Sequence, residues 1–301
     1  MGGGLRHVRG ATALGLLALL GWAASNALTR DLVTRLGPNT VLAVGFGGGG
    51  LVLALVESVR LRSFRALVAF PPRYLVTAGA CFVGYCGAYA YGFSLAADDD
   101  QALVLGLVNY LWPAALLLLS LHFFNHRARW ALLLPGLVVA GLGVVVAAVP
   151  SWAAIRSFAA TPPLPVAIML VAAVLWGLYS NLARRDSRPG DASGVPVFAL
   201  ATGLLFAVVR TAGGESSQWD PSVAAPLGFL AVFVSGLCYL FWDVGVRKGD
   251  LVLLGACSYG LPVAATLVSC AWLGRPLTAW LAAGSVLVAG GAVLCRLGIR
   301  P

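Results

Sequence analysis

The chain has 301 residues, of which 60% are hydrophobic and only 10% are charged, and its mean hydropathy is +0.90. Soluble globular proteins carry about 25% charged residues, so this composition excludes that class and indicates a polytopic membrane protein. The formal charge of +9 does not indicate a nucleic-acid-binding protein, because the arginines are scattered through short connectors and form no basic face with interleaved aromatic residues.

Ten apolar runs follow one another along the chain, and each predicts a membrane-spanning helix. They lie near residues 11–29, 39–56, 74–96, 102–121, 130–149, 163–182, 195–209, 223–246, 251–273 and 277–297. No clear cleavage site follows the first run, so it is predicted to be a retained span and not a signal peptide. The connectors are too short to be domains. We therefore expect an all-α integral membrane protein with a single membrane domain.

The basic residues are distributed unevenly between the two sides of this ten-helix arrangement. Fifteen of the 20 Lys and Arg residues fall on one side and five on the other. Because cytoplasmic loops of membrane proteins are enriched in Lys and Arg, both termini are predicted to be cytoplasmic. The acidic run Asp98, Asp99 and Asp100 then lies outside, which agrees with this orientation.

An internal repeat divides the chain into a first half, residues 1–150, and a second half, residues 151–301. Residues 25–31 (SNALTRD) match 180–186 (SNLARRD) at an offset of 155, and 110–113 (YLWP) match 259–262 (YGLP) at an offset of 149. Each half has five helices. Because five is odd, the second half must be inserted upside down, which gives an inverted repeat. Such halves can exchange conformations, which favours a transporter, although duplication also persists for packing reasons alone.

The stretch Asn109-Tyr110-Leu111-Trp112-Pro113 lies in the middle of the fourth apolar run. Proline cannot donate a backbone hydrogen bond, so the helix must bend there or find another partner for the carbonyl that is left free. An amide and two aromatic rings at a bend favour the wall of a binding cavity. The alternative, a bend whose aromatic rings simply pack against neighbouring helices, is equally consistent with this stretch alone.

Further polar and aromatic side chains lie within other predicted spans, where an unpaired polar group is costly to bury. They are Trp22 and Asn26 in helix one, Tyr85 and Tyr89 on one face of helix three, Trp176, Tyr179 and Asn181 in helix six, Tyr239, Trp242 and Asp243 in helix eight, and Ser258 and Tyr259 in helix nine. We expect Asp243 to pair with Arg247, four residues later. Because no other carboxylate lies within a span, the residues favour a neutral or zwitterionic ligand over a lipophilic cation.

Several kinds of site are not indicated. The six cysteines lie in apolar runs without metal-ligand spacing, so we expect free, buried thiols, no metal and no cofactor. The sequence has no HExxH, no GxSxG and no cluster of His with carboxylates, so we do not expect an enzyme. The glycines of Gly45-x-x-x-Gly49, with Gly136, Gly141 and Gly143, are typical of close helix packing.

Three segments carry a resemblance to a known family: 106–113 (GLVNYLWP), 242–245 (WDVG) and 258–262 (SYGLP). Together with the ten helices and the inverted repeat, they resemble the EamA-type proteins of the drug/metabolite transporter superfamily, and most of all the YddG-type aromatic amino acid exporters of bacterial inner membranes. Asp243 stands where that branch is expected to carry asparagine. The resemblance implies export of aromatic and other apolar amino acids by alternating access. It also implies a cavity lined by Trp22, Tyr85, Tyr110, Trp112, Trp176, Ser258 and Tyr259.

The combined hypothesis assigns substrate binding to Trp22, Tyr85, Tyr89, Asn109, Tyr110, Trp112, Trp176, Tyr179, Ser258 and Tyr259, with hinges at Pro113 and Pro262. Trp112 and Trp176 would stack on the substrate side chain, and Asn109 and Ser258 would hold its amino and carboxylate groups. The expected partners are a small-molecule substrate and the lipid bilayer, and a monomer is expected with a dimer left open. The alternatives are a broader metabolite or drug exporter and a membrane receptor or scaffold that does not transport.

Overall fold

The computed structural model describes residues 2–23, 25–124, 127–148, 163–186, 192–249, 254, 257–258 and 260–300. Within these ranges the fold is helical apart from β1 (Arg127–Ala128) and β2 (Ile299–Arg300), which form one short antiparallel pair. The prediction of an all-α membrane fold is confirmed in its class.

Eight helical segments lie in the described part of the first half. These are α1 (Gly2–Ala23), α2 (Ser25–Leu36), α3 (Pro38–Leu61), the short η1 (Arg65–Val68), α4 (Pro72–Ser94), α5 (Asp99–Asn109), α6 (Trp112–Phe124) and α7 (Trp130–Ala148). The second half contains α9 (Pro163–Asp186), α10 (Val195–Gly213), α11 (Pro221–Phe229), the π-helical η2 (Leu230–Cys238), α12 (Tyr239–Lys248), α14 (Leu261–Trp272) and α15 (Ala279–Leu297).

Five of the helices that the structure describes are long and apolar enough to cross a membrane. They cover Pro38–Leu61, Gln101–Phe124, Pro163–Asp186, Val195–Gly213 and Pro221–Lys248. The pair Val8–Ala23 and Ser25–Leu36, bent by 46°, passes the same test as a sixth span, and Trp130–Gly143, Val263–Trp272 and Ala279–Cys295 are shorter apolar helices. The chain is therefore a multi-pass membrane protein, and the count of ten spans stays a prediction.

Two of the predicted helices are broken where the sequence repeat places a proline. Tyr110 and Leu111 form a turn between α5 and α6, and Pro113 is the second residue of α6. Pro113 has no N–H to donate to the carbonyl of Asn109, four residues earlier, which disfavours a continuous helix. Pro262 is likewise the second residue of α14. Both prolines thus stand in the first turn of a helix, the position at which proline is best tolerated.

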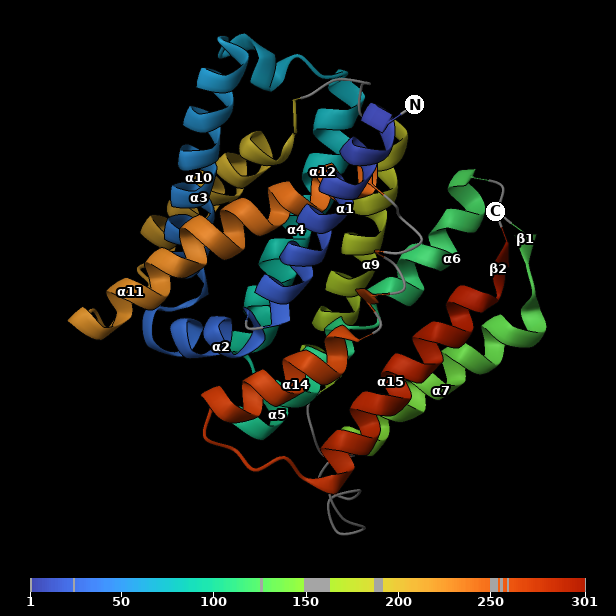
Figure 1. Ribbon diagram of the computed structural model, residues 1–301. Coiled ribbons are helices and arrows are strands. Elements are labelled where there is room, and N and C mark those ends of the chain that lie inside the picture. Colours follow the sequence, from blue (N-terminus) through green and yellow to red (C-terminus); the bar gives the residue numbers. More distant parts are fainter. Residues whose placement is uncertain are drawn as a thin grey trace.

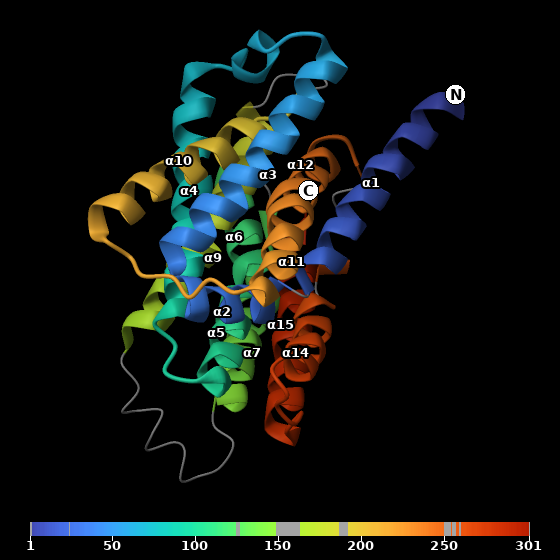
Figure 2. The same ribbon diagram turned by 90° about the vertical axis from the view of Figure 1, so that its left-hand side faces the viewer.

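The most extensive helix contacts join α7 with α15 and α3 with α10. Figure 1 shows α7 and α15 running side by side, and Figure 2 shows the bundle from its left-hand side. In the predicted repeat, α3 and α10 are the second helices of the two halves and α7 and α15 are the fifth. The largest interfaces therefore join helices at corresponding positions of the two halves.

Glycines permit these close approaches. A Cβ atom added to Gly203 would lie 2.3 Å from Cα of Gly47, and one added to Gly291 would lie 2.6 Å from the carbonyl oxygen of Gly136. Gly49 packs in the same way on the backbone of η2. Gly141 differs from the expectation, since an added Cβ there meets nothing within 4 Å.

The six cysteines are free, as predicted, but they are not all buried. Cys257 is exposed and Cys81 is half-buried. An apolar run predicts that a residue is inside the membrane, and it does not distinguish a lipid-facing position from one in the protein core.

Asp243 lies in α12 and is completely buried. Its Oδ2 atom is 2.9 Å from a guanidinium nitrogen of Arg247 and accepts a hydrogen bond of 2.7 Å from the hydroxyl of Ser193. The expected pairing with Arg247 is therefore confirmed. Because the two charges neutralise each other, Asp243 adds no net charge to the interior.

Hydrogen bonds join the connector between α10 and α11 to the start of α3. One carboxylate oxygen of Glu215 accepts hydrogen bonds from the backbone N–H of Asn39, at 3.1 Å, and the other from that of Thr40, at 2.7 Å. Arg35 in α2 is also paired with Asp220, which precedes α11. Hydrogen bonds from Ser222 and Arg35 hold the pKa of Asp220 below its ordinary value. These contacts join the two halves of the chain at one end of the bundle.

Gly203→Ala tests the role of the glycine contact between α3 and α10. The added methyl group must push the two backbones apart, so we expect a loss of about 1–3 kcal/mol of stability, seen as a lower unfolding temperature in detergent. Gly213→Ala in the same helix is the matched control, because its Cβ would meet nothing within 4 Å. Equal unfolding temperatures for the two variants would contradict this account of the interface.

Candidate functional site

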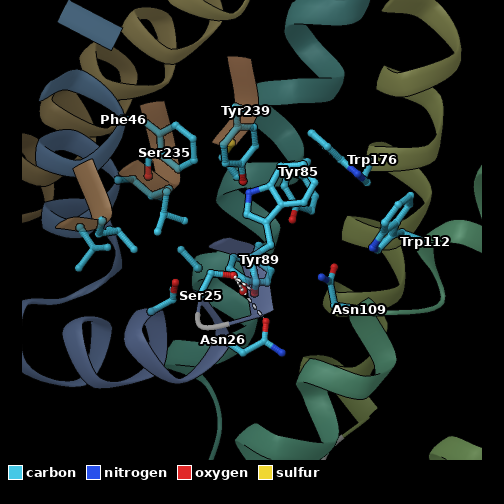
Figure 3. A pocket seen from close by; sticks show the side chains of 18 of the residues that line it. Ser25, Asn26, Phe46, Tyr85, Tyr89, Asn109, Trp112, Trp176, Ser235 and Tyr239 are labelled. Atoms are coloured by element: carbon cyan, nitrogen blue, oxygen red, sulfur yellow. Dashed lines mark hydrogen bonds between the residues drawn. The ribbon is translucent and has the colours of Figure 1, made fainter. Parts of the chain in front are cut away.

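A cavity lies where α1, α2, α3, α4, α9, η2, α12 and α14 surround the turn between α5 and α6, and its empty volume, adjoining open space included, is about 610 Å³. The lining consists of Trp22, Ser25, Asn26, Thr29, Val41, Leu42, Phe46, Tyr85, Cys86, Tyr89, Ala90, Asn109, Tyr110, Trp112, Trp176, Leu230, Val234, Ser235, Tyr239 and Leu261. Figure 3 shows Asn109 and Trp112 on one side and Phe46 and Ser235 on the other.

Seven of the ten predicted substrate-binding residues line this cavity: Trp22, Tyr85, Tyr89, Asn109, Tyr110, Trp112 and Trp176. The alternative for the Asn109–Pro113 stretch, packing of its aromatic rings on neighbouring helices, also agrees with the structure, because Trp112 packs on Trp242 with ring centroids 5.4 Å apart. Asn109 and Trp112 are three residues apart and lie on one side of the segment, with Tyr110 in the turn between α5 and α6, so all three reach the cavity.

The other three predicted residues do not form part of the described lining. Tyr179 is fully buried next to Trp176, with ring centroids 5.0 Å apart, so it supports the wall from behind. The hydroxyl of Ser258 donates a hydrogen bond of 2.7 Å to the carbonyl of Leu254, one turn earlier, and Ser258 does not reach the cavity. Its expected role in holding the substrate is therefore not supported. Tyr259 lies outside the described residues.

The aromatic rings form a continuous wall at one end of the cavity. The ring centroid of Trp22 lies 5.4 Å from that of Trp176 and 5.3 Å from that of Tyr239. Tyr85 packs on Trp176 with centroids 4.8 Å apart. Such offset and edge contacts stabilise aromatic clusters beyond the area that they bury. The wall offers ring faces and edges to a ligand with an apolar or aromatic side chain.

The opposite end of the cavity is polar. The Tyr89 hydroxyl donates a hydrogen bond of 2.6 Å to Oδ1 of Asn26 and lies 3.3 Å from the Ser25 hydroxyl, as the dashed lines of Figure 3 show. Ser25 and Asn26 begin α2, directly after the bend between α1 and α2. The hypothesis omitted both from the binding set. The repeated segment at 25–31 was the signal that could have found them.

Two lining atoms are buried and have no hydrogen-bond partner among the residues that the structure describes: Nε1 of Trp22 and Oδ1 of Asn109. An indole N–H can only donate a hydrogen bond, and a carbonyl oxygen of an amide can only accept one. Leaving such a group unpaired in the interior costs about 1–3 kcal/mol. Among the lining residues, Trp22 therefore has a donor and Asn109 an acceptor that the described residues leave unpaired.

Among the residues that the structure describes, no charged side chain belongs to the cavity lining. The buried Arg30, beyond the polar end, donates to the carbonyl of Phe93 at 2.9 Å and is paired with Asp99. Asp243 is paired with Arg247. Since these charges are compensated outside the lining, the cavity suits a ligand without net charge.

Comparison with known proteins gives consistent results. The sequence pattern of the EamA-like transporter family matches residues 164–297. The aromatic amino acid exporters YddG of Salmonella typhimurium and Ancylobacter novellus are each 31% identical to this chain, and each alignment covers 96% of this chain and 98% of the relative. YddG of Escherichia coli is 28% identical with the same coverage.

A solved protein crystal structure has the same fold. It superposes with a TM-score of 0.73 at 27% sequence identity, and the match covers 96% of this chain and 98% of that one. The family consists of transporters and not of enzymes, in agreement with the absence of catalytic motifs from the sequence. The chain belongs to the EamA family of the drug/metabolite transporter superfamily.

Proposed function

We propose that this protein is a secondary transporter that exports aromatic and other apolar amino acids across the bacterial inner membrane by alternating access. Relatives that align over nearly the whole chain are named aromatic amino acid exporters. The cavity supports the same substrate class, because its lining is aromatic and uncharged.

The observation that carries the proposal is the pair of unpartnered atoms in the cavity, Trp22 Nε1 and Asn109 Oδ1. An amino acid brings a carboxylate, which accepts hydrogen bonds, and an ammonium group, which donates them. The Trp22 N–H would bind the carboxylate and Asn109 Oδ1 would bind the ammonium. Both bonds would be charge-assisted and therefore stronger than neutral ones. Trp22 takes the place that the sequence hypothesis gave to Ser258.

The aromatic wall would then hold the side chain of the substrate. Trp112 lies beside Asn109 at the break between α5 and α6 (Figure 3), and its other neighbour is Trp242, with ring centroids 5.4 Å apart. Trp176 already contacts Tyr85 and Tyr179. A substrate ring would pack on Trp112 and on the part of Trp176 that lines the cavity.

The movement that transports the substrate would be a rocking of residues 1–150 against 151–301, built as an inverted repeat of ten spans with both termini in the cytoplasm. The contacts of α3 with α10 and of α7 with α15 support the inverted repeat, because they pair corresponding helices of the two halves. The two ends of the chain lie in the upper half of both ribbon views, which agrees with termini on one side (Figures 1 and 2). Pro113 and Pro262, each at the start of a helix after a break, would serve as hinges.

Trp112→Ala and Trp176→Ala test the aromatic wall. Each variant removes a ring on which the aromatic side chain of the substrate would be buried. Burial of such a side chain contributes about 1.5–3 kcal/mol to binding, so we expect the affinity for phenylalanine and tryptophan to fall roughly tenfold to a hundredfold. The measurement is saturable uptake by proteoliposomes. Trp272→Ala is the control, since that side chain is 52% exposed and lines no part of the cavity. Unchanged transport in both cavity variants would overturn the proposal.

Trp22→Phe and Asn109→Leu test the two polar contacts separately. Trp22→Phe should weaken binding of phenylalanine about tenfold or more and change binding of phenethylamine, which has no carboxylate, much less. Asn109→Leu should weaken phenylalanine by a similar factor and spare 3-phenylpropionate, which has no ammonium group. Ligand protection against thermal unfolding reports the affinities. Equal losses for the zwitterion and the truncated ligands would show that neither atom recognises the backbone groups and would favour the broader metabolite exporter.

A further inference from the structure

Asn26 and Asn181 occupy the same place in the repeated segments 25–31 and 180–186, and both are buried. The serine before each makes an equivalent contact. The Ser25 hydroxyl lies 3.3 Å from the Tyr89 hydroxyl of α4, and the Ser180 hydroxyl accepts a hydrogen bond of 3.4 Å from Nε1 of Trp242 in α12. Since α4 and α12 belong to the third predicted span of each half, the surroundings of the two asparagines correspond in space as well as in sequence.

The amide of Asn181 joins two helices. Its Nδ2 atom donates to the carbonyl of Leu116 in α6 at 3.1 Å and to the carbonyl of Gly177 in its own helix, α9, at 2.8 Å. The helices are in close contact there, because a Cβ added to Gly177 would lie 2.9 Å from the backbone nitrogen of Leu116. Asn181 therefore holds α9 and α6 in close contact. We call such a contact between two helices beside the cavity a seam, and this one is closed.

The amide of Asn26 does not make the corresponding bond. Its Oδ1 atom accepts from Tyr89 at 2.6 Å, and no hydrogen bond links it to α14 as far as α14 is described, from Leu261 to Trp272. At the offset of the second repeated segment, 149, the counterpart of Leu116 is Ala265 in α14, which is buried. The interface of α2 with α14 is smaller than that of α9 with α6, and Asn26 faces the cavity, so we interpret the seam between α2 and α14 as the looser of the two.

We propose that Asn26 and Asn181 are alternating latches for the two faces of the transporter. The inference rests on the proposed alternating access between inverted halves. In the opposite-facing conformation α2 closes on α14, Nδ2 of Asn26 donates to the carbonyl of Ala265, and Asn181 releases Leu116. An uncharged amide suits this task, because a helix carbonyl already bonded within its helix has a second lone pair that can accept another hydrogen bond.

The two closed seams are not of equal strength. At the offset of 155, the residue equivalent to Gly177 is Trp22. When α2 closes on α14, the indole ring of Trp22 must fit into the contact. In the contact between α9 and α6, the equivalent residue is Gly177, which has only a hydrogen atom as its side chain. This difference favours the conformation described here when the cavity is empty. A substrate that binds Trp22 contacts the side chain that obstructs closure.

The test measures access to the cavity from each side of the membrane. Cys86 lines the cavity and serves as the reporter once the other five cysteines are replaced by serine. A membrane-impermeant methanethiosulfonate reagent is applied to right-side-out and to inside-out vesicles, and mass spectrometry gives the ratio of the outer to the inner labelling rate. On the predicted topology, Asn181 lies toward the cytoplasmic end of α9, so the present conformation opens to the outside.

The two asparagine variants should shift this ratio in opposite directions. Asn181→Ala removes the latch of the present conformation and should lower the outer-to-inner ratio about twofold to tenfold, as expected for one hydrogen bond. Asn26→Asp keeps the oxygen that accepts from Tyr89 and removes the amide donor, so it should raise the ratio by a similar factor. Ser285→Ala is the control, because its buried hydroxyl bonds only within α14 and α15 and its loss should leave the ratio unchanged.

Shifts of both variants in the same direction, or no shift in either, would overturn the proposal. If Asn181→Ala does not yield folded protein, Asn26→Asp tests the proposal by itself. A lower or unchanged outer-to-inner labelling ratio in Asn26→Asp would contradict the proposal. Labelling needs no substrate, so the outcome is separate from that of the transport assays. Opposite shifts without amino acid flux would refute the substrate and keep the latch, and flux without opposite shifts would do the reverse.

Discussion

The cost of leaving a polar group unpaired away from water governs this structure. Within a bilayer the backbone must satisfy its own hydrogen bonds, which leaves helices as the solution for a sequence of this composition. Several charged and polar side chains in the interior are paired in the same way, as Asp243 is with Arg247 and Asn26 is with Tyr89, whereas some buried atoms away from the cavity, such as the Tyr179 hydroxyl, have no partner among the described residues. Only Trp22 Nε1 and Asn109 Oδ1 of these unpartnered atoms belong to residues that line the cavity, and in the proposed function they pair with the ligand.

The cavity exists because the bundle packs tightly in some places and is interrupted in others. Glycine contacts bring α3 against α10 and α7 against α15. Breaks before α2 and α6 stop the helices that would otherwise fill the middle, and they turn short polar and aromatic segments inward. In the proposed mechanism, the same breaks are the places at which the helices bend. Interfaces between corresponding helices of the two halves, with interrupted helices around the cavity, suit a transporter built as an inverted repeat.

The helical membrane class and part of the cavity lining could be predicted from the sequence. Apolar run length determines the helices, and the Asn109–Pro113 stretch combines a proline break with groups that are costly to leave facing lipid. The positions of Tyr179 and Ser258 could not be predicted, because both are mid-span polar residues and only the rotation of each helix decides which of them faces the cavity. The exposure of Cys257 and the open space at Gly141 escaped prediction for the same reason. The contribution of Ser25 and Asn26 depends on the bend after α1, which no proline marks.

The central claim is that the cavity carries amino acids across the membrane, and flux through the purified protein tests it most directly. Labelled phenylalanine, tryptophan, threonine and methionine would be measured in proteoliposomes, with and without a pH gradient. The account predicts saturable flux that is fastest for the aromatic amino acids, and the response to the gradient would show whether protons are coupled. Binding of these amino acids without any flux would contradict transport and favour a receptor, and neither binding nor flux would contradict the substrate class.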